Sequence, residues 1–598
     1  MKRLFSTCLV ASALAACAGQ QNGFDQAFTK RWQSDSGDSA NRLYERLKGT
    51  AAPSAVQVAV GVTRDGLVGK PLGAGAGWSY AGRIDTVPQV SGGVVAFTSG
   101  ANIVALDAQS GALLWKVDAG KRQLRGVGDD GSTTAVSLGD AQGTLPSQFL
   151  LVTRSGSVAH RYEMRAPLGV PAVYGGIAFV PWDNQYVTAI DATTGEEVAR
   201  ILLRHQVSHA QTIGGELYFG QLGLTRFDEK IGAAQRQGAN FVALPEKKVP
   251  GDPEWYKDGT QVYTPSNSAT TKIHLWARPA PNTEGLGVAG NTYAAGYFSV
   301  AFGLDAKDGS LKWTRALGGD IVGGGAAADG FALCDATGKV WGVGSSGQAP
   351  LTLANLGKPL AACVVQADSL GVAGEPDASI AEQVQAVFDT HRPSLATAYS
   401  FLVEELPSID DPLVTKILID LIEHPRTVPS LAKRAEVLLA KQRTGVEYML
   451  AALERHYDFL SGNRPPPVGP LAVALAAIGD RNAAPLLAKH LNDPATATRD
   501  VPLVASALAE LATSRETDDL KTFFALYRAT ADEPPLVEAV VKIAHTLIRV
   551  GGPSGQEMVE FAATDPLTHP TVRSKITETI YRKAPKPAPK AQADGKAT

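Results

Sequence analysis

The chain has 598 residues, several times the length of one domain, so we expect at least two domains. Its composition is neither that of a fibrous protein nor that of a membrane-spanning one. The formal net charge is -3, and no long Lys/Arg cluster stands in the predicted folded part, which argues against a basic nucleic-acid-binding surface.

The N-terminus has the charge-then-apolar order of a secretory signal peptide. Lys2 and Arg3 precede an uncharged, mostly apolar run over 4–16, which is too short to cross a bilayer as a helix. The run leads into the sequence LAAC, which ends at Cys17 and resembles the lipobox of bacterial lipoproteins. The resemblance implies cleavage after residue 16 and acylation of Cys17. The alternative is an ordinary signal peptide with a chance cysteine at its cleavage site.

The lipobox resemblance also implies a location. Ala18 rather than Asp follows the cysteine, which in that family directs a lipoprotein to the outer membrane. A multi-chain lipid anchor holds a protein on a membrane far better than one acyl chain. We therefore expect a lipid anchor in the outer membrane, on its periplasmic face, with the cell surface as the alternative. Residues 1–16 are then the signal peptide and 17–50 an N-terminal linker.

Residues 51–370 are predicted to form an antiparallel β domain with an internal repeat. Short alternating apolar runs are interrupted by Gly, Asp, Asn or Ser, as in strands joined by tight turns. The clearest copy has two strand-like runs over 94–107, a turn of the form Asp-x-x-x-Gly from Asp107 to Gly111, and then Trp115. Equivalent glycines lie about 40 or about 80 residues apart, so each longer gap predicts one degenerate copy. The marker glycines are Gly69, Gly111, Gly195, Gly232, Gly309 and Gly347.

A repeat of about 40 residues with four short strands is the period of a propeller blade. Six markers and two degenerate copies, near 149–158 and 262–276, predict eight blades, with seven as the alternative. The strand-like run 361–365 is expected to complete a blade begun by the N-terminal segment, which removes free sheet edges.

The repeat resembles that of pyrroloquinoline-quinone-like (PQQ-like) propellers. The resemblance rests on two copies of Leu-Asp-Ala followed by a turn glycine and a tryptophan, which is Trp115 in one copy and Trp313 in the other. In that family the tryptophan docks against the neighbouring blade. The sequence departs from the pattern at Ala199 and Leu351. The resemblance implies the fold but not the function, because the family includes both quinone dehydrogenases and lipoprotein scaffolds.

The segment 250–281 carries aromatic residues among prolines and polar residues, namely Trp255, Tyr256, Tyr263 and Trp276. If the segment loops out from a blade, these are residue types that anchor protein interfaces. If it forms the outer strands of the sixth blade, they are packing residues. Both interpretations stay open.

Residues 375–582 are predicted to be helical, because glycine punctuation nearly stops and apolar residues recur at three- and four-residue spacing. The stretch 471–494, with two apolar helical segments and an Asp-Pro turn, resembles a HEAT-type repeat. The resemblance implies an α-solenoid of about five helix pairs with an extended face for a partner. The tail 583–598 is rich in Lys, Pro and Ala and is predicted to be disordered.

Two cysteines remain after processing, because Cys8 leaves with the signal peptide and Cys17 is lipidated. An oxidising periplasm would permit a disulfide between Cys334 and Cys363. Two separate buried thiols are the alternative.

The sequence predicts no catalytic, cofactor or metal site. Quinone dehydrogenases of this fold family hold their cofactor beside a disulfide between adjacent cysteines, and this chain has no adjacent cysteines. His205 and His209 have a metal-ligand spacing for a helix but lie between predicted strands, so we interpret them as ordinary histidines. The glycine-rich run 318–325 lacks the Lys-Ser/Thr of a phosphate-binding loop, and close packing of an inner strand explains it.

These features predict a non-catalytic protein-binding scaffold. Among lipid-anchored PQQ-like propellers, the resemblance is to the BamB family, whose members serve the outer-membrane β-barrel assembly complex. It implies envelope proteins, among them that complex, as partners. The alternatives are a quinone- or ligand-binding propeller, acting as an enzyme or a sensor, and a structural component of another envelope or secretion apparatus.

Overall fold

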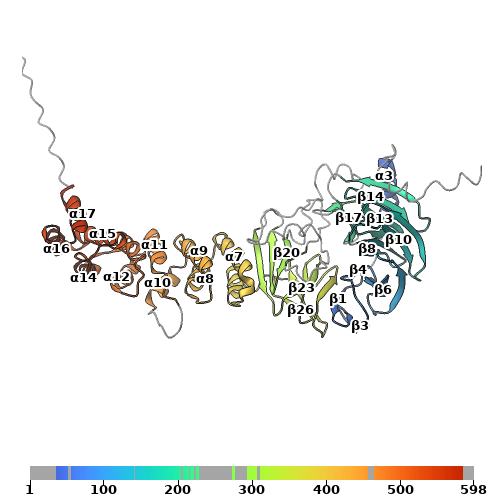
Figure 1. The fold of residues 1–598 in the computed structure, drawn as a ribbon, viewed down its shortest axis with the longest axis horizontal. Coiled ribbons are helices and arrows are strands. Elements are labelled where there is room, and N and C mark those ends of the chain that lie inside the picture. The colour runs from blue at the N-terminus through green and yellow to red at the C-terminus, as the bar shows by residue number, and fades with distance from the viewer. Residues whose placement is uncertain are drawn as a thin grey trace, which may run out of the picture. The chain divides into compact units, whose positions relative to one another are not determined.

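The chain divides into two units, residues 1–401 and 402–598 (Figure 1). The structure is a computed structural model. It describes residues 36–50, 55–140, 142–203, 207–213, 216–220, 224–227, 273–276, 292–305, 310–372, 374–455 and 464–582. Within these ranges no helix has the length and apolar character needed to cross a membrane.

The described strands of the first unit form antiparallel meanders, in which consecutive strands are hydrogen-bonded neighbours. Three sheets contain β4 (Gln89–Ser91), β5 (Val94–Ser99), β6 (Asn102–Asp107) and β7 (Leu113–Asp118); β8 (Gln123–Asp129), β9 (Thr133–Gly139), β10 (Ser147–Thr153) and β11 (Val158–Met164); and β12 (Ala172–Tyr174), β13 (Ile177–Trp182), β14 (Tyr186–Asp191) and β15 (Glu197–Leu202). Two more contain β16 (His209–Ile213), β17 (Glu216–Gly220) and β18 (Leu224–Arg226); and β19 (Ile273–Trp276), β20 (Thr292–Tyr297), β21 (Val300–Asp305) and β22 (Leu311–Ala316).

The remaining sheet joins the two ends of the β-rich sequence. It contains β1 (Val58–Thr63), β2 (Gly66–Pro71), β3 (Trp78–Ala81), β23 (Ile321–Ala326), β24 (Gly330–Asp335), β25 (Lys339–Gly344), β26 (Leu351–Asn355) and β27 (Ala362–Gln366). Strand β27 pairs antiparallel with β1, from Val58 opposite Gln366 to Val62 opposite Ala362. The predicted completion of an N-terminal blade by a strand near 361–365 is therefore present, and the unit is a β-propeller (Figure 1).

Seven groups of three or four strands can be distinguished in the described residues, if the eight-stranded sheet is divided between β23 and β27. The predicted degenerate copy near 149–158 lies in β10 and β11 of one group. The copy predicted near 262–276 contributes β19 to the group that also holds Asp305. Gly69, the first marker glycine, lies within β2, and Asp65 before it lies in the turn between the second and third strands of its group. The turn from Asp107 to Gly111 joins the third and fourth strands of its own group, so Gly69 does not mark an equivalent turn.

Aromatic side chains on outer strands dock against glycines of the next group. The indole N–H of Trp313 in β22 donates to the carbonyl of Ser345 at 3.0 Å, beside Gly347. Trp115 in β7 packs on Gly156, as a Cβ on that glycine would lie 2.7 Å from the Cβ of Trp115, but its indole N–H has no hydrogen-bond partner among the described residues. The docking role predicted for Trp115 and Trp313 is thus present.

Two further dockings were not predicted. The indole N–H of Trp78 donates to the carbonyl of Ala108 at 3.1 Å, and the hydroxyl of Tyr162 donates to the carbonyl of Gly195 at 2.6 Å. Burial raises the pKa of Tyr162 to about 12. A tyrosine therefore serves where the repeat pattern has tryptophan.

The stretch 17–50, predicted to be a linker, contains a helix, α3 (Ser36–Leu47). Its apolar residues Ala40, Leu43 and Leu47 recur on one face and are buried in a cluster with residues of β12–β15. Ala199, where the sequence departs from the docking tryptophan, belongs to the same cluster. A small residue there leaves room for the helix. This helix was not predicted, because a short amphipathic helix finds its apolar partner only in the folded propeller.

The glycine-rich run 318–325 leads into the closely packed strand β23, as the packing interpretation predicts. A Cβ on Gly323 would lie 1.9 Å from the carbonyl oxygen of Cys363, and one on Gly325 would lie 2.0 Å from that of Val365. Only glycine lets β23 approach the backbone of β27 so closely.

The first unit also includes the first helical turns after the propeller. Helix α6 (Ile380–Phe388) begins at Ser379, whose side chain and that of Glu382 form a capping box. It covers the outer strand β22, where the buried side-chain oxygen of Gln383 accepts from the N–H of Thr314 at 3.1 Å. The short 3-10 helix η2 (Pro393–Leu395) follows, and α7 (Ala396–Glu405) spans the boundary between the units. The predicted boundary near 375 thus precedes the division by about one helix pair.

In the second unit, helices contact their neighbours in sequence and the helix two further along, for example α11 with α13 and α13 with α15. The α-helices are α8 (Leu413–Glu423), α9 (Pro429–Leu439), α10 (Val446–Glu454), α11 (Val468–Ile478), α12 (Ala484–Asn492), α13 (Val501–Leu511), α14 (Thr517–Tyr527), α15 (Pro534–Val550), α16 (Gly552–Thr564) and α17 (Pro570–Arg582). The 3-10 helices are η3 (Leu406–Ser408), η5 (Arg481–Ala483) and η6 (Ser514–Glu516).

Asp-Pro turns separate several of these helices. In each, the aspartate carboxylate accepts the N–H two residues along, at 2.9 Å from Asp411, 2.8 Å from Asp493 and 2.9 Å from Asp565. Proline cannot donate a hydrogen bond, so the carboxylate takes over the next free N–H and fixes the turn.

Candidate functional site

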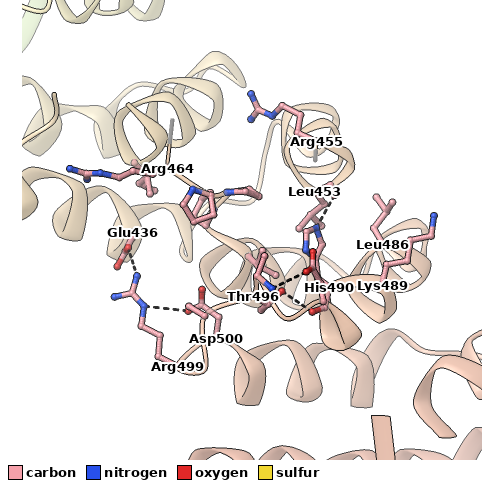
Figure 2. Close-up of a pocket in the computed structure, with 18 of the residues that line it drawn as sticks. Glu436, Leu453, Arg455, Arg464, Leu486, Lys489, His490, Thr496, Arg499 and Asp500 are labelled. Atoms are coloured by element: carbon pink, nitrogen blue, oxygen red, sulfur yellow. Dashed lines mark hydrogen bonds and ion pairs between the residues drawn. The ribbon is translucent and has the colours of Figure 1, made fainter. Parts of the chain in front are cut away.

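A groove of about 590 Å³ opens on the second unit, a volume in the range of ligand-binding pockets (Figure 2). Its buried apolar base includes Ile422 of α8, Ala432 of α9, Leu453 of α10 and Val468 of α11. Charged and polar residues surround this base, contributed by Glu436, Glu454, Arg455, Arg464, Lys489, His490, Asp493, Thr496, Arg499 and Asp500.

Two proline-containing segments shape the groove. Pro465, Pro466 and Pro467 stand before α11, where three prolines prevent the chain from adding a regular turn to the helix. Their rings offer apolar contact and no N–H donors. On the other side, the turn at Asp493 is closed by Thr496, whose hydroxyl donates to the carbonyl of His490 at 2.7 Å.

An ion-pair network holds the side of the groove between α9 and α13. Arg499 donates to Glu436 at 2.8 Å, and its Nε lies 3.7 Å from Asp500 (Figure 2). Burial raises the pKa of Asp500, while Arg499 and the N–H of Gly469 oppose that rise. The carboxylates on this side therefore already have a cation, and a ligand is not needed to neutralise them.

A second ion pair lies beside the groove, where Arg455 donates to Glu423 at 2.9 Å. Burial raises the pKa of Glu423 to about 7; Arg455 opposes the rise and Asp420 adds to it. Near neutral pH this carboxyl is thus partly protonated, and the guanidinium of Arg455, about half exposed, is only partly neutralised.

Two other cations at the groove lack a carboxylate partner among the described residues. The guanidinium of Arg464 donates to the main-chain oxygen of Thr427 at 3.0 Å. Lys489 is exposed on α12. Figure 2 shows Arg455, Arg464 and Lys489 pointing away from the centre of the groove. The groove thus combines an apolar base with charged edges, which suits contact with a polypeptide segment.

The structure places the cysteines predicted to remain after processing together. Cys334 in β24 and Cys363 in β27 form a disulfide, and both residues are fully buried. Cys17 lies outside the described residues.

The predicted partner-contact aromatics are not brought together in the described part of the chain. Trp255, Tyr256 and Tyr263 lie outside the described residues, and Trp276 ends strand β19 with its side chain undescribed. His205 is likewise outside them. His209 is buried in β16, and burial lowers its pKa to about 4, so it is neutral at physiological pH. In the described ranges no group of three or more His, Cys, Asp or Glu is placed to hold a metal ion.

The groove was not predicted from the sequence. Its lining comes from five helices, α8 to α12, and two connecting segments, and no spacing in the chain reveals such a convergence. The signal closest to it is the run of prolines 465–467, which marks an unusual connection between two helices.

Comparison with known proteins supports the fold of the first unit. A family model described as outer membrane protein assembly factor BamB matches residues 101–269, which include β6 to β18 and less than half of the chain. No curated protein matches.

Several solved structures are similar to the chain at low identity. BamB from Moraxella catarrhalis is 15% identical, with 52% of this chain and 87% of that chain covered and a TM-score of 0.28. Hsv2 from Kluyvelomyces marxianus is 10% identical, with 44% and 73% covered and a TM-score of 0.26. The computationally designed Ika8 protein is 8% identical, with 54% and 95% covered and a TM-score of 0.29. TM-scores this low carry no argument, so among these comparisons only the family model supports a β-propeller with BamB-like, PQQ-like repeats, and it does so over residues 101–269.

Proposed function

We propose that this protein is a non-catalytic scaffold of the bacterial envelope that binds proteins of outer-membrane assembly. The observation that carries the proposal is the match of the BamB family model to residues 101–269, within the propeller. Fold alone does not fix function, so partner and location are argued from further features.

The disulfide supports an oxidising compartment. Such bonds persist in secreted and periplasmic proteins and are rare in the cytosol. Together with the lipobox-like sequence before Cys17, it favours export and lipid anchoring at the outer membrane. The anchor would keep the propeller at the membrane where barrel proteins assemble.

The second unit is proposed to be a HEAT-like solenoid that contributes a second binding surface. Its helices contact near neighbours in sequence, as in stacked helical repeats. The groove described above is the surface we assign to a polypeptide partner, because it is apolar at its base and its inner carboxylates are already paired.

Affinity purification of the full-length protein from detergent-solubilised envelopes of its own host tests this proposal. We expect subunits of the β-barrel assembly complex among the partners identified by mass spectrometry. Recovery of only other envelope proteins would contradict the assembly role while keeping the scaffold class. A copurifying quinone, seen as an absorbance band in the eluate, would contradict the non-catalytic assignment.

A further inference from the structure

The disulfide stands at the point where the propeller ring closes. Cys334 lies in β24 of the last strand group along the chain, and Cys363 lies in β27, the strand that completes the first group. The bond therefore joins two neighbouring groups rather than two strands of one group. Because 29 positions separate the two cysteines, it also encloses β25 and β26.

Hydrogen bonding secures β27 unequally on its two sides. It pairs with β1 over five residue pairs, from Val58 to Val62. On the side of β23 it pairs at only Gly323 and Gly324. The contact between the last group and β27 thus has little strand pairing, and the disulfide lies on that side.

Residues 367–379 connect β27 to helix α6, and contacts with neighbouring strand groups hold part of this connection. Asp329 accepts the N–H groups of Leu370 and Gly371 at 2.8 and 2.9 Å, and Arg315 forms an ion pair with Asp377. These contacts hold the connection between β27 and α6 against the last two strand groups. Because the connection begins directly after Gln366, any movement of its first residues would pull on the end of β27.

We propose that the Cys334–Cys363 disulfide is a redox latch on the ring, a bond that forms as β27 enters and then keeps the ring closed even in the presence of reductant. In its formation the two thiols lose two electrons and two protons to the disulfide of a thiol–disulfide oxidant, which becomes a dithiol. Reduction by a dithiol reverses this exchange, and it requires a thiolate to reach one of the sulfurs.

Burial makes the latch one-way. Cys334 and Cys363 are both 0% exposed and lie in a cluster with Ala332, Val340 and Val365. A reductant thiolate therefore has no route to either sulfur while β27 is in place. Reduction has to follow detachment of β27, which the bond itself opposes.

The first test uses the oxidised full-length protein with dithiothreitol as the reductant. Thiols are alkylated after incubation and counted by mass spectrometry. We expect no alkylation of Cys334 or Cys363 in the native protein and alkylation of both in urea. Rapid reduction of the native protein would overturn the latch.

The second test compares hydrogen exchange of the oxidised protein with that of the same sequence refolded under reductant, so that the side chains are identical. We expect amides of β27 and β1 to exchange at least about tenfold faster in the reduced protein, with β8–β15 unchanged. Equal exchange in β27, or a uniform increase over the propeller, would overturn the proposal.

If the reduced chain does not refold, the Cys334→Ala/Cys363→Ala double variant replaces it. Selective fast exchange in β27 and β1, or loss of the first unit's unfolding transition with the second unit's retained, supports the latch. If the amides of β27 and β1 exchange in that variant at the same rates as in the oxidised wild-type protein, the proposal is overturned.

Discussion

The two units are held together by different kinds of contact. In the propeller, residues far apart in sequence pair directly, as Val58 does with Gln366, so the ring depends on strands from both ends of the β-rich part. In the helical unit, contacts run mostly between helices one or two positions apart. Damage at one propeller position should therefore weaken the whole ring, whereas damage to one helix should remain local.

The largest expected effect is at the closing strand. Gly325→Ala places a Cβ 2.0 Å from the carbonyl oxygen of Val365, so β23 or β27 must move. We expect a loss of about 4 kcal/mol in the unfolding free energy of the first unit, with the second unit unaffected. Differential scanning calorimetry, which separates two transitions, measures both.

The matched control for that substitution is Gly318→Ala. Gly318 is exposed and has no atom within 4 Å of the added Cβ. Its variant should differ from wild type by less than about 0.5 kcal/mol. Equal effects of the two substitutions would contradict the close approach of β23 and β27.

A smaller effect is expected from the docking aromatics, graded by burial. Trp313→Ala removes a fully buried ring and should cost the first unit about 3 kcal/mol, whereas Trp78→Ala removes a partly exposed ring and should cost about half as much. Chemical denaturation of the two variants against wild type checks the order. The reverse order would show that docking does not scale with burial.

The two units should also respond to pH in opposite directions. His209 in the first unit has its pKa lowered from 6.5 to about 4, so its contribution to stability is present above pH 6.5 and is lost as the pH falls toward 4. Glu423 in the second unit has its pKa raised from 4.5 to about 7, so its contribution is present below pH 4.5 and is lost as the pH rises toward 7.

Denaturant midpoints of each unit at about pH 5 and about pH 8, for wild type, His209→Gln and Glu423→Gln, isolate these contributions. Each substitution should flatten the pH dependence of its own unit only. A change in slope in the other unit would contradict the assignment of these residues to separate units.

The smallest effect on stability is expected at the groove. Lys489 is exposed, so Lys489→Ala should change the unfolding free energy of the second unit by less than about 0.5 kcal/mol. Under the proposed function it should still lower the recovery of envelope partners in affinity purification. Unchanged recovery would remove Lys489 from the proposed contact surface.

The sequence was sufficient for features that repeat and insufficient for those that depend on convergence. Asp107, Gly111 and Trp115 revealed the repeat because turn chemistry recurs at fixed spacing. The pairing of Cys334 with Cys363 could not be decided, because it depends on β27 lying beside the last strand group. The docking role of Tyr162 was not predicted, because a tyrosine stands where the repeat pattern has a tryptophan.

Helix α3 and the groove were missed for the same physical reason. The apolar face of α3 is buried only because it packs against β15, a strand far along the chain. The groove forms only where several helices and two proline-containing connections meet. The periodicity of apolar residues along the sequence shows neither which strand covers α3 nor which segments meet at the groove.

Site-specific photo-crosslinking in the host examines whether the protein binds assembly proteins as a scaffold. A photoreactive residue in place of Lys489, at the groove, is compared with one in place of Lys433, an exposed position on α9 outside it. If the protein is such a scaffold, we expect a crosslink from position 489 to a subunit of the β-barrel assembly complex, and none from position 433. Affinity-purified protein that contains no such subunit, with no crosslink from either position, would contradict it.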